Sequence, residues 1–190
     1  MMTATAERRD LIHYACERCL KWAVRDVREA KYHGAAGIWI EECLTDLIRP
    51  KDYRLLGLKW LRPLVEEIRS AGLASIHYFC GDPSGRWDLL LDSGADALSL
   101  EESKKGFVID IEDVAERVAG RCAILGNLDA IGTLQDGSEE ALGAEIARQI
   151  AAGRRNGSRF VTSLGSPVTP GTPVDRVRLY CEMARATGMR

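Results

Sequence analysis

One pattern recurs along the chain: a helical stretch ends near a glycine, two or three residues follow, and a short apolar run begins. Glycine directly after a helix accommodates the left-handed conformation of a C-terminal cap, so each repeat predicts a helix, a cap and a strand. Apolar runs without polar alternation favour strands buried on both faces, as in a parallel sheet between helices. Five repeats therefore predict an α/β chain of βα units. The glycines are Gly34, Gly72, Gly94, Gly120 and Gly157, and the runs after them span 37–40, 75–79, 97–100, 122–125 and 160–162.

Helices are expected between these strands. Asp110 and Ser138 are candidate N-caps, because their short side-chain oxygens can accept from the first free N–H groups of a helix. Thr172 is a third candidate N-cap, with Pro173 at the first helical position. The expected helices cover about 6–33, 50–70, 85–92, 110–119 and 138–156, and a last one begins at 172–173.

Length and composition limit the class of protein. A chain of 190 residues with 46% apolar and 28% charged residues fits a single globular domain over 1–190. A net charge of −2 gives no electrostatic reason to expect nucleic acid or an anionic membrane as a partner. The apolar runs are too short for a membrane span and the start is polar, so a cytoplasmic protein is expected.

The six cysteines lie mostly in helix-like or strand-like segments, so reduced thiols are favoured over disulfides. Cys16 and Cys19 are three residues apart in the first expected helix, which places both thiols on one face. Such a pair could hold a metal. Core packing is favoured, because no second pair follows at the spacing of a zinc finger.

Polar and acidic side chains follow the expected strands. The carboxyl ends of barrel strands converge on one mouth, where active sites are built. Any single carboxylate there is more often a loop or capping residue, and helix N-caps alone would also enrich acids at these ends. The agreement of five strand ends favours a site. Its candidate catalytic residues are Glu41, Glu42, Asp82, Asn127 and Asp129.

His77 and Cys80 end the second apolar run, and with a carboxylate from Glu41 or Glu42 they are residue types that bind zinc. Catalytic zinc takes about three protein ligands and keeps one position open. A regular strand points residues three apart to opposite faces, so both can bind only if the chain turns near Phe79 or Cys80. The alternative is a partly buried histidine and an inert core cysteine. The predicted metal ligands are His77, Cys80 and Glu41.

Four motifs together resemble the uroporphyrinogen decarboxylase superfamily, in consistent order over essentially the whole chain. They are Ile76-His-Tyr-Phe-Cys-Gly-Asp, Ser93-Gly-Ala-Asp-Ala-Leu, Gly126-Asn-Leu-Asp and Gly171-Thr-Pro-Val-Asp-Arg-Val. The segment Leu47-Ile-Arg-Pro-Lys-Asp-Tyr is similar to a turn that follows a strand in that family. The resemblance implies an eight-stranded (β/α)8 TIM barrel, of which this chain holds about five units.

The resemblance implies one of two kinds of enzyme. Porphyrinogen decarboxylases need no metal or organic cofactor. The zinc methyltransferases of the family carry a methyl group between a corrinoid and a thiol-type acceptor, and their zinc stabilises the acceptor thiolate. Their zinc is held by a His-x-Cys pair and a later Cys. His77 and Cys80 resemble that pair with one extra residue between them, and the later Cys would fall near Ser166.

Length is the main departure from the family, because a complete barrel takes roughly 250 residues. The chain resembles the C-terminal part, so it is expected to form a homo-oligomer or to pair with a missing N-terminal half. The favoured function is zinc-dependent methyl transfer, with a small-molecule substrate, a methylated corrinoid and a corrinoid protein as expected partners. The alternatives are uroporphyrinogen decarboxylation, which uses no cofactor, and a truncated half-barrel without catalytic activity.

Overall fold

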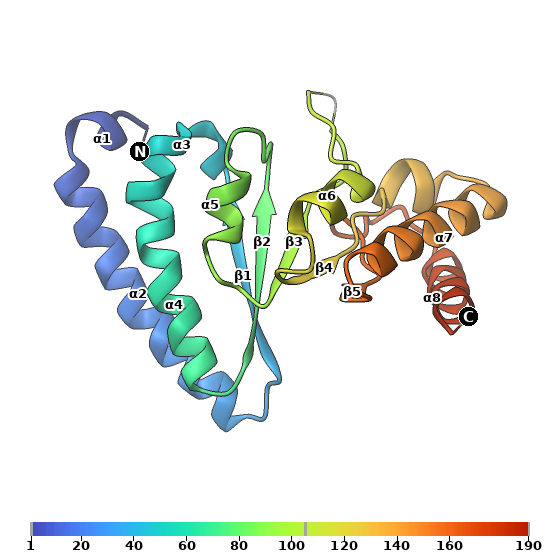
Figure 1. Ribbon diagram of the computed structural model, residues 1–190, viewed down its shortest axis with the longest axis horizontal. Helices are drawn as coiled ribbons and strands as arrows, with labels where there is room; N and C mark the ends of the chain where they lie inside the picture. Colours follow the sequence, from blue (N-terminus) through green and yellow to red (C-terminus); the bar gives the residue numbers. More distant parts are fainter. Residues whose placement is uncertain (1, 105, 190) are drawn as a thin grey trace. The chain divides into compact units, whose positions relative to one another are not determined.

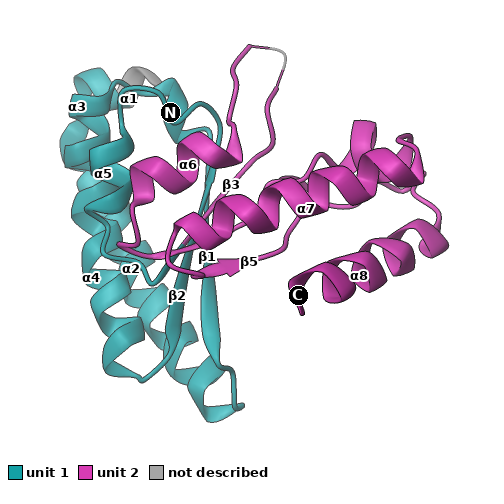
Figure 2. Cartoon of the chain, turned by 45° about the vertical axis from the view of Figure 1, so that its right-hand side comes forward, with its two compact units in different colours: residues 1–97 teal, residues 98–190 magenta. Residues whose placement is uncertain are grey.

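The structure is a computed structural model that describes residues 2–104 and 106–189. The chain divides into two compact units, 1–97 and 98–190, and the division falls inside strand β3 (Figure 2). The prediction of a single domain over 1–190 stays a prediction.

The first unit pairs two parallel strands with helices. In the sheet, β1 (Gly37–Cys43) lies beside β2 (Ala74–Cys80), and Gly37 pairs with Ala74 at one end and Cys43 with Cys80 at the other. Two long helices, α2 and α4, pack against each other in the same unit (Figure 1). The other elements of this unit are α1 (Met2–Glu7), α2 (Arg9–Tyr32), η1 (Thr45–Leu47), α3 (Pro50–Tyr53), η2 (Arg54–Leu58), α4 (Lys59–Ser70) and α5 (Trp87–Leu91).

The helices cover one face of the two strands. Val27 of α2, Ile68 of α4 and Leu73 form a buried cluster, and Ile38 and Ile40 of β1 pack against it. Because side chains alternate along a strand, the even-numbered residues of β1 point toward the helices and the odd-numbered ones point away. This assignment decides on which face each candidate site residue lies.

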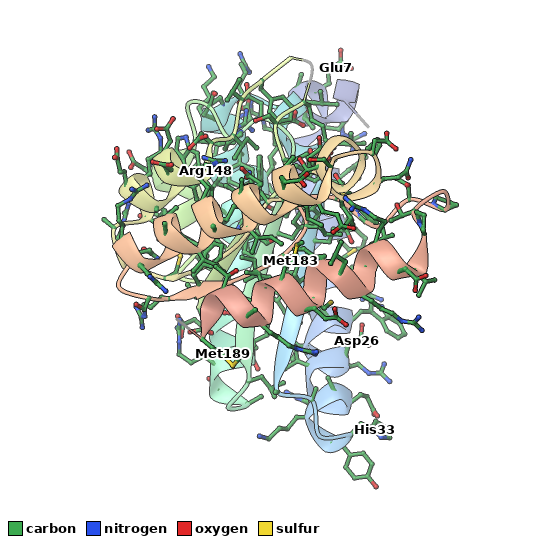
Figure 3. All side chains as sticks on the ribbon, turned by 90° about the vertical axis from the view of Figure 1, so that its right-hand side faces the viewer. Glu7, Asp26, His33, Arg148, Met183 and Met189 are labelled. Carbon is green, nitrogen blue, oxygen red and sulfur yellow. The ribbon has the colours of Figure 1, made fainter. Side chains whose placement is uncertain are left out.

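The second unit continues the βα pattern. Its strands follow one another in the order β3, β4 and β5, and β4 pairs with β5 in parallel. Leu128, Leu134, Leu142 and Ile146 form its core, and Met183 packs against this core between α7 and α8 (Figure 3). Its elements are β3 (Ala97–Leu100), α6 (Ile111–Val118), β4 (Ala123–Leu125), η3 (Ala130–Gln135), α7 (Glu139–Arg155), β5 (Phe160–Val161) and α8 (Val174–Gly188).

The structure confirms the predicted class, an α/β chain with five parallel strands of a partial (β/α)8 barrel. Each strand begins and ends within three residues of its predicted bounds. Two of the predicted caps are also confirmed: Asp110 accepts from the Glu112 N–H and Ser138 from the Ala141 N–H. The third was one residue early. Pro173 is the N-cap of α8, without a side-chain cap, because its φ of −60° and ψ of 139° leave it outside the helix.

Two predicted helices are interrupted. The first breaks at Arg8, whose backbone leaves the helical region between α1 and α2. The second, predicted over 50–70, contains the π-helical segment η2 between α3 and α4. Among the described residues, no helix combines the length and the apolar character that crossing a membrane requires.

Candidate functional site

A buried hydrogen-bond network lies on the helix-covered face of β1 and β2. Glu42 Oε2 is 2.8 Å from His77 Nε2 and accepts a hydrogen bond of 2.6 Å from the Tyr53 hydroxyl. The His77 side chain is 0% exposed and the Glu42 side chain 14%. The strand register places Ile40 opposite His77, so Glu42 is one step farther along the same face. We call Glu42, His77 and Tyr53 the buried triad.

The surroundings of the buried triad determine which of its atoms carry a hydrogen. Burial, and next the neighbouring Glu42 charge, raise the pKa of Tyr53 above its ordinary range, so the phenol keeps its proton and donates. An ionised Glu42 can only accept, which requires His77 to carry its hydrogen on Nε2. His77 Nδ1 is buried and has no hydrogen-bond partner among the described residues.

Phe79 and Arg86 complete the surroundings of the buried triad. The ring of Phe79 is fully buried and lies 6.2 Å from the Tyr53 ring and 6.4 Å from the His77 ring. The Arg86 guanidinium lies 5.7 Å from the Phe79 ring centroid. Arg86 donates to the carbonyls of Thr45, Asp46 and Ile48, so it holds the turn that follows β1.

Sequence reasoning missed both Tyr53 and Arg86 as members of this cluster. Tyr53 ends the Leu47-Ile-Arg-Pro-Lys-Asp-Tyr segment that carried part of the family resemblance, and this segment was the available signal. Arg86 had no such signal, because its partners are backbone carbonyls about 40 residues earlier in the chain.

The opposite face of the same strands carries two thiols and a carboxylate. Glu41 Oε1 lies 3.2 Å from Cys43 Sγ, and Cys43 is the register partner of Cys80. Trp39 and Tyr78 belong to this face as well, with ring centroids 5.2 Å apart. Both cysteines are the last residues of their strands, the ends at which parallel α/β folds build sites. We call Glu41, Cys43 and Cys80 the thiol face.

The structure does not bring the predicted metal ligands His77, Cys80 and Glu41 together. His77 points toward the helices, whereas Cys80 and Glu41 belong to the thiol face. The turn that would reunite them comes too late, because β2 stays extended through Cys80 and the positive φ of 121° is at Gly81. A Cβ on Gly81 would overlap the Asp46 carboxylate, so glycine is also required for space.

The remaining predicted catalytic residues have contacts that shape loops. Asp82 Oδ1 accepts from the Ser84 N–H at 2.9 Å. Asp129 caps η3 by accepting from the N–H groups of Ile131 and Gly132. These two side chains therefore order the backbone after β2 and β4, and no described contact joins either one to the buried triad or the thiol face.

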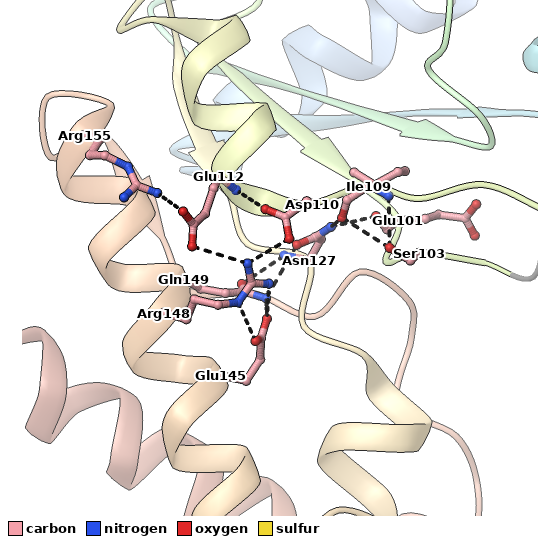
Figure 4. A network of polar contacts seen from close by, with 10 residues as sticks. All are labelled: Glu101, Ser103, Ile109, Asp110, Glu112, Asn127, Glu145, Arg148, Gln149 and Arg155. Carbon is pink, nitrogen blue, oxygen red and sulfur yellow. Dashed lines mark hydrogen bonds and ion pairs between the residues drawn. The ribbon is translucent and has the colours of Figure 1, made fainter.

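Asn127 also orders backbone. Its amide donates to the carbonyls of Glu101 at 3.1 Å and Ile109 at 2.9 Å, and its own N–H donates to Gln149 Oε1 (Figure 4). Asn127 is buried, so these bonds tie the ends of β3 and β4 to α7 within the second unit.

Ion pairs next to Asn127 join α6 to α7. Arg148 of α7 contacts Glu145 at 2.8 Å and Asp110 at 2.9 Å, and Arg155 contacts Glu112 at 2.6 Å (Figure 4). The hydrogen bonds from Arg148 to Glu145 are the largest cause that raises the pKa of Arg148, which stays charged. This network is a structural clamp between helices.

A second polar cluster lies at the ends of β3 and β5, and none of its residues was among the predicted site residues. Lys104 Nζ donates to Glu102 at 2.6 Å and to Ser166 at 2.9 Å, and Ser166 donates to Glu102 at 2.7 Å. Gly165 permits this approach, since a Cβ there would overlap the backbone of Glu102. Burial alone would lower the pKa of Lys104, but the Glu102 and Glu101 carboxylates raise it overall, which favours the cationic form of Lys104.

Comparison with protein families matches residues 1–187 to the model described as uroporphyrinogen decarboxylase (URO-D). The chain belongs to the uroporphyrinogen decarboxylase family. This match confirms the resemblance found in the four motifs. The βα units of this chain are therefore units of a uroporphyrinogen decarboxylase-family fold.

Curated relatives of this family chain include two bacterial uroporphyrinogen decarboxylases. The protein from Solibacter usitatus is 28% identical over 154 residues, which are 80% of this chain and 41% of that protein. The protein from Prochlorococcus marinus is 23% identical over 175 residues, which are 91% of this chain and 48% of that protein. The chain thus spans less than half the length of these curated relatives.

A solved structure, a methyltransferase from Methanosarcina mazei, has a similar fold. Its TM-score is 0.84 at 20% sequence identity, and the match covers 97% of this chain and 52% of that one. At this level of identity the likeness shows the fold. It supports the assignment of the fold as a partial (β/α)8 barrel.

Proposed function

We propose that this chain is part of a methyltransferase that moves a methyl group from a methylated corrinoid to a thiol-type acceptor at the thiol face. The observation that carries the proposal is the register of β1 and β2, which sets Cys43 beside Cys80. The contact between Cys43 and Glu41 supports it. The likeness in fold to a solved methyltransferase supports it.

The chemistry of the thiol face suits a thiol acceptor. A thiolate is the nucleophilic form of a thiol, so the proton of the acceptor must leave before transfer. Glu41, which already accepts from the Cys43 thiol, is a carboxylate to which that proton can pass. The acceptor sulfur then forms the S–C bond, the Co–C bond breaks, and its electron pair stays on cobalt.

Zinc does not fit the described side chains as they stand. No group of three or more His, Cys, Asp and Glu side chains among the described residues could hold a metal ion. His77 faces away from Glu41 and Cys80, and its Nε2 is engaged with Glu42. The proposed methyl transfer therefore uses no zinc. Metal analysis of the purified protein and of Cys80→Ser tests the zinc prediction directly, since zinc content unchanged by the substitution would contradict it.

The assay for methyl transfer uses methylcobalamin and 2-mercaptoethanol as probes, with the chain alone and with added protein that carries the remaining barrel units. Loss of the Co–C bond is followed by absorbance, and the S-methyl product by mass spectrometry. We expect Cys43→Ser and Cys80→Ser each to lower the rate by about tenfold or more, a change of about 1.4 kcal/mol in the barrier.

The matched control is Cys181→Ser, the same substitution at a half-buried cysteine of α8, which we expect to leave the rate unchanged. Methyl transfer that survives in Cys43→Ser and Cys80→Ser at the rate of the unaltered chain would contradict the proposal.

Uroporphyrinogen decarboxylation is the second candidate, because the curated relatives include enzymes of that name. It needs a proton donor to the carbanion left by carbon dioxide, and the Tyr53 hydroxyl and the His77 ring both contact Glu42 in the buried triad. The same preparations, given uroporphyrinogen, separate the two functions. Decarboxylated product without any methyl transfer would favour the second candidate.

The predicted partners and location are part of the proposal. In the first unit β1 pairs with β2 on one side, and Trp39 of β1 is 46% exposed. An edge strand with exposed aromatic surface favours pairing with further strands. We expect the purified chain to associate with itself or with a chain that supplies more barrel strands, in the cytoplasm. Light scattering that finds only a stable monomer, alone and in the mixture, would contradict this expectation.

A further inference from the structure

A pocket of about 240 Å³ that opens to solvent lies in the first unit, between α2, η2, α4 and β1. Cys16 and Cys19 of α2 line one wall, and Leu56, Trp60 and Leu61 line another. Glu42 is the charged side chain among its lining residues. The pocket is therefore on the helix-covered side of β1, whereas the thiol face is on the other side.

Glu42 has one oxygen to offer to a ligand. Its Oε2 accepts from Tyr53 and His77, whereas its Oε1 makes no hydrogen bond with the described residues. A carboxylate that is mostly removed from water and holds an unused oxygen gains from a cationic or N–H donor. A ligand anion would instead meet a like charge in apolar surroundings.

The side chains that line the pocket favour a ligand with an aromatic ring. The Trp60 indole is held in place by its N–H, which donates to His13 Nδ1 at 3.3 Å, and by the Lys59 ammonium 5.0 Å from its ring. An apolar cavity of about 150 Å³ accommodates benzene, and drug-sized ligands need roughly 300 Å³ or more. A volume of about 240 Å³ lies between the two and suits a single ring with a chain of two or three atoms.

We propose that this pocket binds a small arylalkylamine, with the ring between α2 and Trp60 and the ammonium group on Glu42 Oε1. The proposal is independent of the methyl transfer proposed above. Binding places the ammonium group of the ligand next to Glu42, so an occupant of the pocket also interacts with the buried triad.

The native thiols report on occupancy. Cys16 is half-buried and Cys19 is exposed, both line the pocket and neither is in a disulfide, so we expect a ligand that covers these thiols to slow their alkylation by iodoacetamide. Burial, and next the Cys19 thiol, raise the pKa of Cys16 and so slow its alkylation, whereas Cys19 is exposed and serves as the faster reporter. Rates are followed by peptide mass spectrometry with three probes of similar size: 2-phenylethylamine, 2-phenylethanol and 3-phenylpropanoate.

We expect saturating 2-phenylethylamine to slow alkylation of Cys19 at least fivefold and to leave that of Cys181 unchanged. The neutral alcohol should protect more weakly and the anion not at all. Equal protection by the amine and 3-phenylpropanoate would overturn the proposal, and so would the absence of protection by the amine.

Two variants and one control test the assignment to Glu42. Glu42→Gln keeps the shape and removes the charge, so the amine concentration for half protection should rise about tenfold or more. Ala23→Phe fills the pocket and leaves Glu42 in place, so it should abolish protection even if Glu42→Gln does not fold. Glu17→Gln removes the same charge beside Cys16, outside the pocket lining, and should change nothing. Undiminished protection in Glu42→Gln or in Ala23→Phe would also overturn the proposal.

Discussion

Replacing Phe79 with alanine is expected to lower the free energy of unfolding by about 3–5 kcal/mol. The side chain is fully buried and packs edge-on against Tyr53 and His77. Its removal leaves a cavity beside the hydrogen-bonded side chains of Tyr53 and His77. The Arg86 guanidinium also loses the ring that faces it. Collapse cannot close such a cavity, because β2 and the Thr45–Ile48 turn hold the surrounding groups in place.

The measurement is urea unfolding followed by tryptophan fluorescence. All four tryptophans, Trp22, Trp39, Trp60 and Trp87, belong to residues 1–97, so the signal reports on the first unit. Phe107→Ala is the matched control, since Phe107 is only half-buried and lies in the second unit. A loss below about 1 kcal/mol for Phe79→Ala would show that this ring is not part of a close-packed core.

Replacing Glu42 with leucine is expected to cost about 2–4 kcal/mol of unfolding free energy. The substitution leaves two buried donors, the Tyr53 hydroxyl and His77 Nε2, without an acceptor, at roughly 1–3 kcal/mol each. Part of this cost is offset, because the carboxylate itself is mostly buried and its removal recovers the free energy of taking a charge out of water.

A double-mutant cycle with Tyr53→Phe separates these effects. Phenylalanine removes only the hydroxyl, so one orphaned donor disappears in the double variant, which should be more stable than the sum of the single losses predicts. We expect a coupling free energy of about 1–2 kcal/mol from the same fluorescence measurement. Losses that add to within about 0.5 kcal/mol would contradict a direct interaction between the two side chains.

The positions of the strands could be predicted because their signals are local. Each strand follows a glycine cap within a few residues and is a run of apolar side chains, and each expected strand is present. The caps at Asp110 and Ser138 have the same origin, since a capping side chain bonds to N–H groups two or three residues away. The break at Arg8 and the π-helical turn in η2 left no comparable pattern of residue types.

The candidate site was less predictable, because it depends on which face of the sheet each strand side chain points to. The alternation of strand side chains already implied that His77 and Cys80 point apart unless the chain turned before Cys80. The residue that makes the turn, Gly81, comes one position too late. Which of the two then faced the helices depended on the packing of Ile38 and Ile40 against α2 and α4.

By itself, the sequence determined the α/β class, the number of strands, the family and the residue types available for chemistry, since these follow from patterns within about 40 residues and from shared motifs. Only the tertiary structure decided which residues contact one another. Tyr53 and Arg86 reach their acceptors across 11 to 41 residues, and Cys43 meets Cys80 through the strand register. Such contacts depend on how strands pair and which face the helices cover, and no local pattern of residues specifies either.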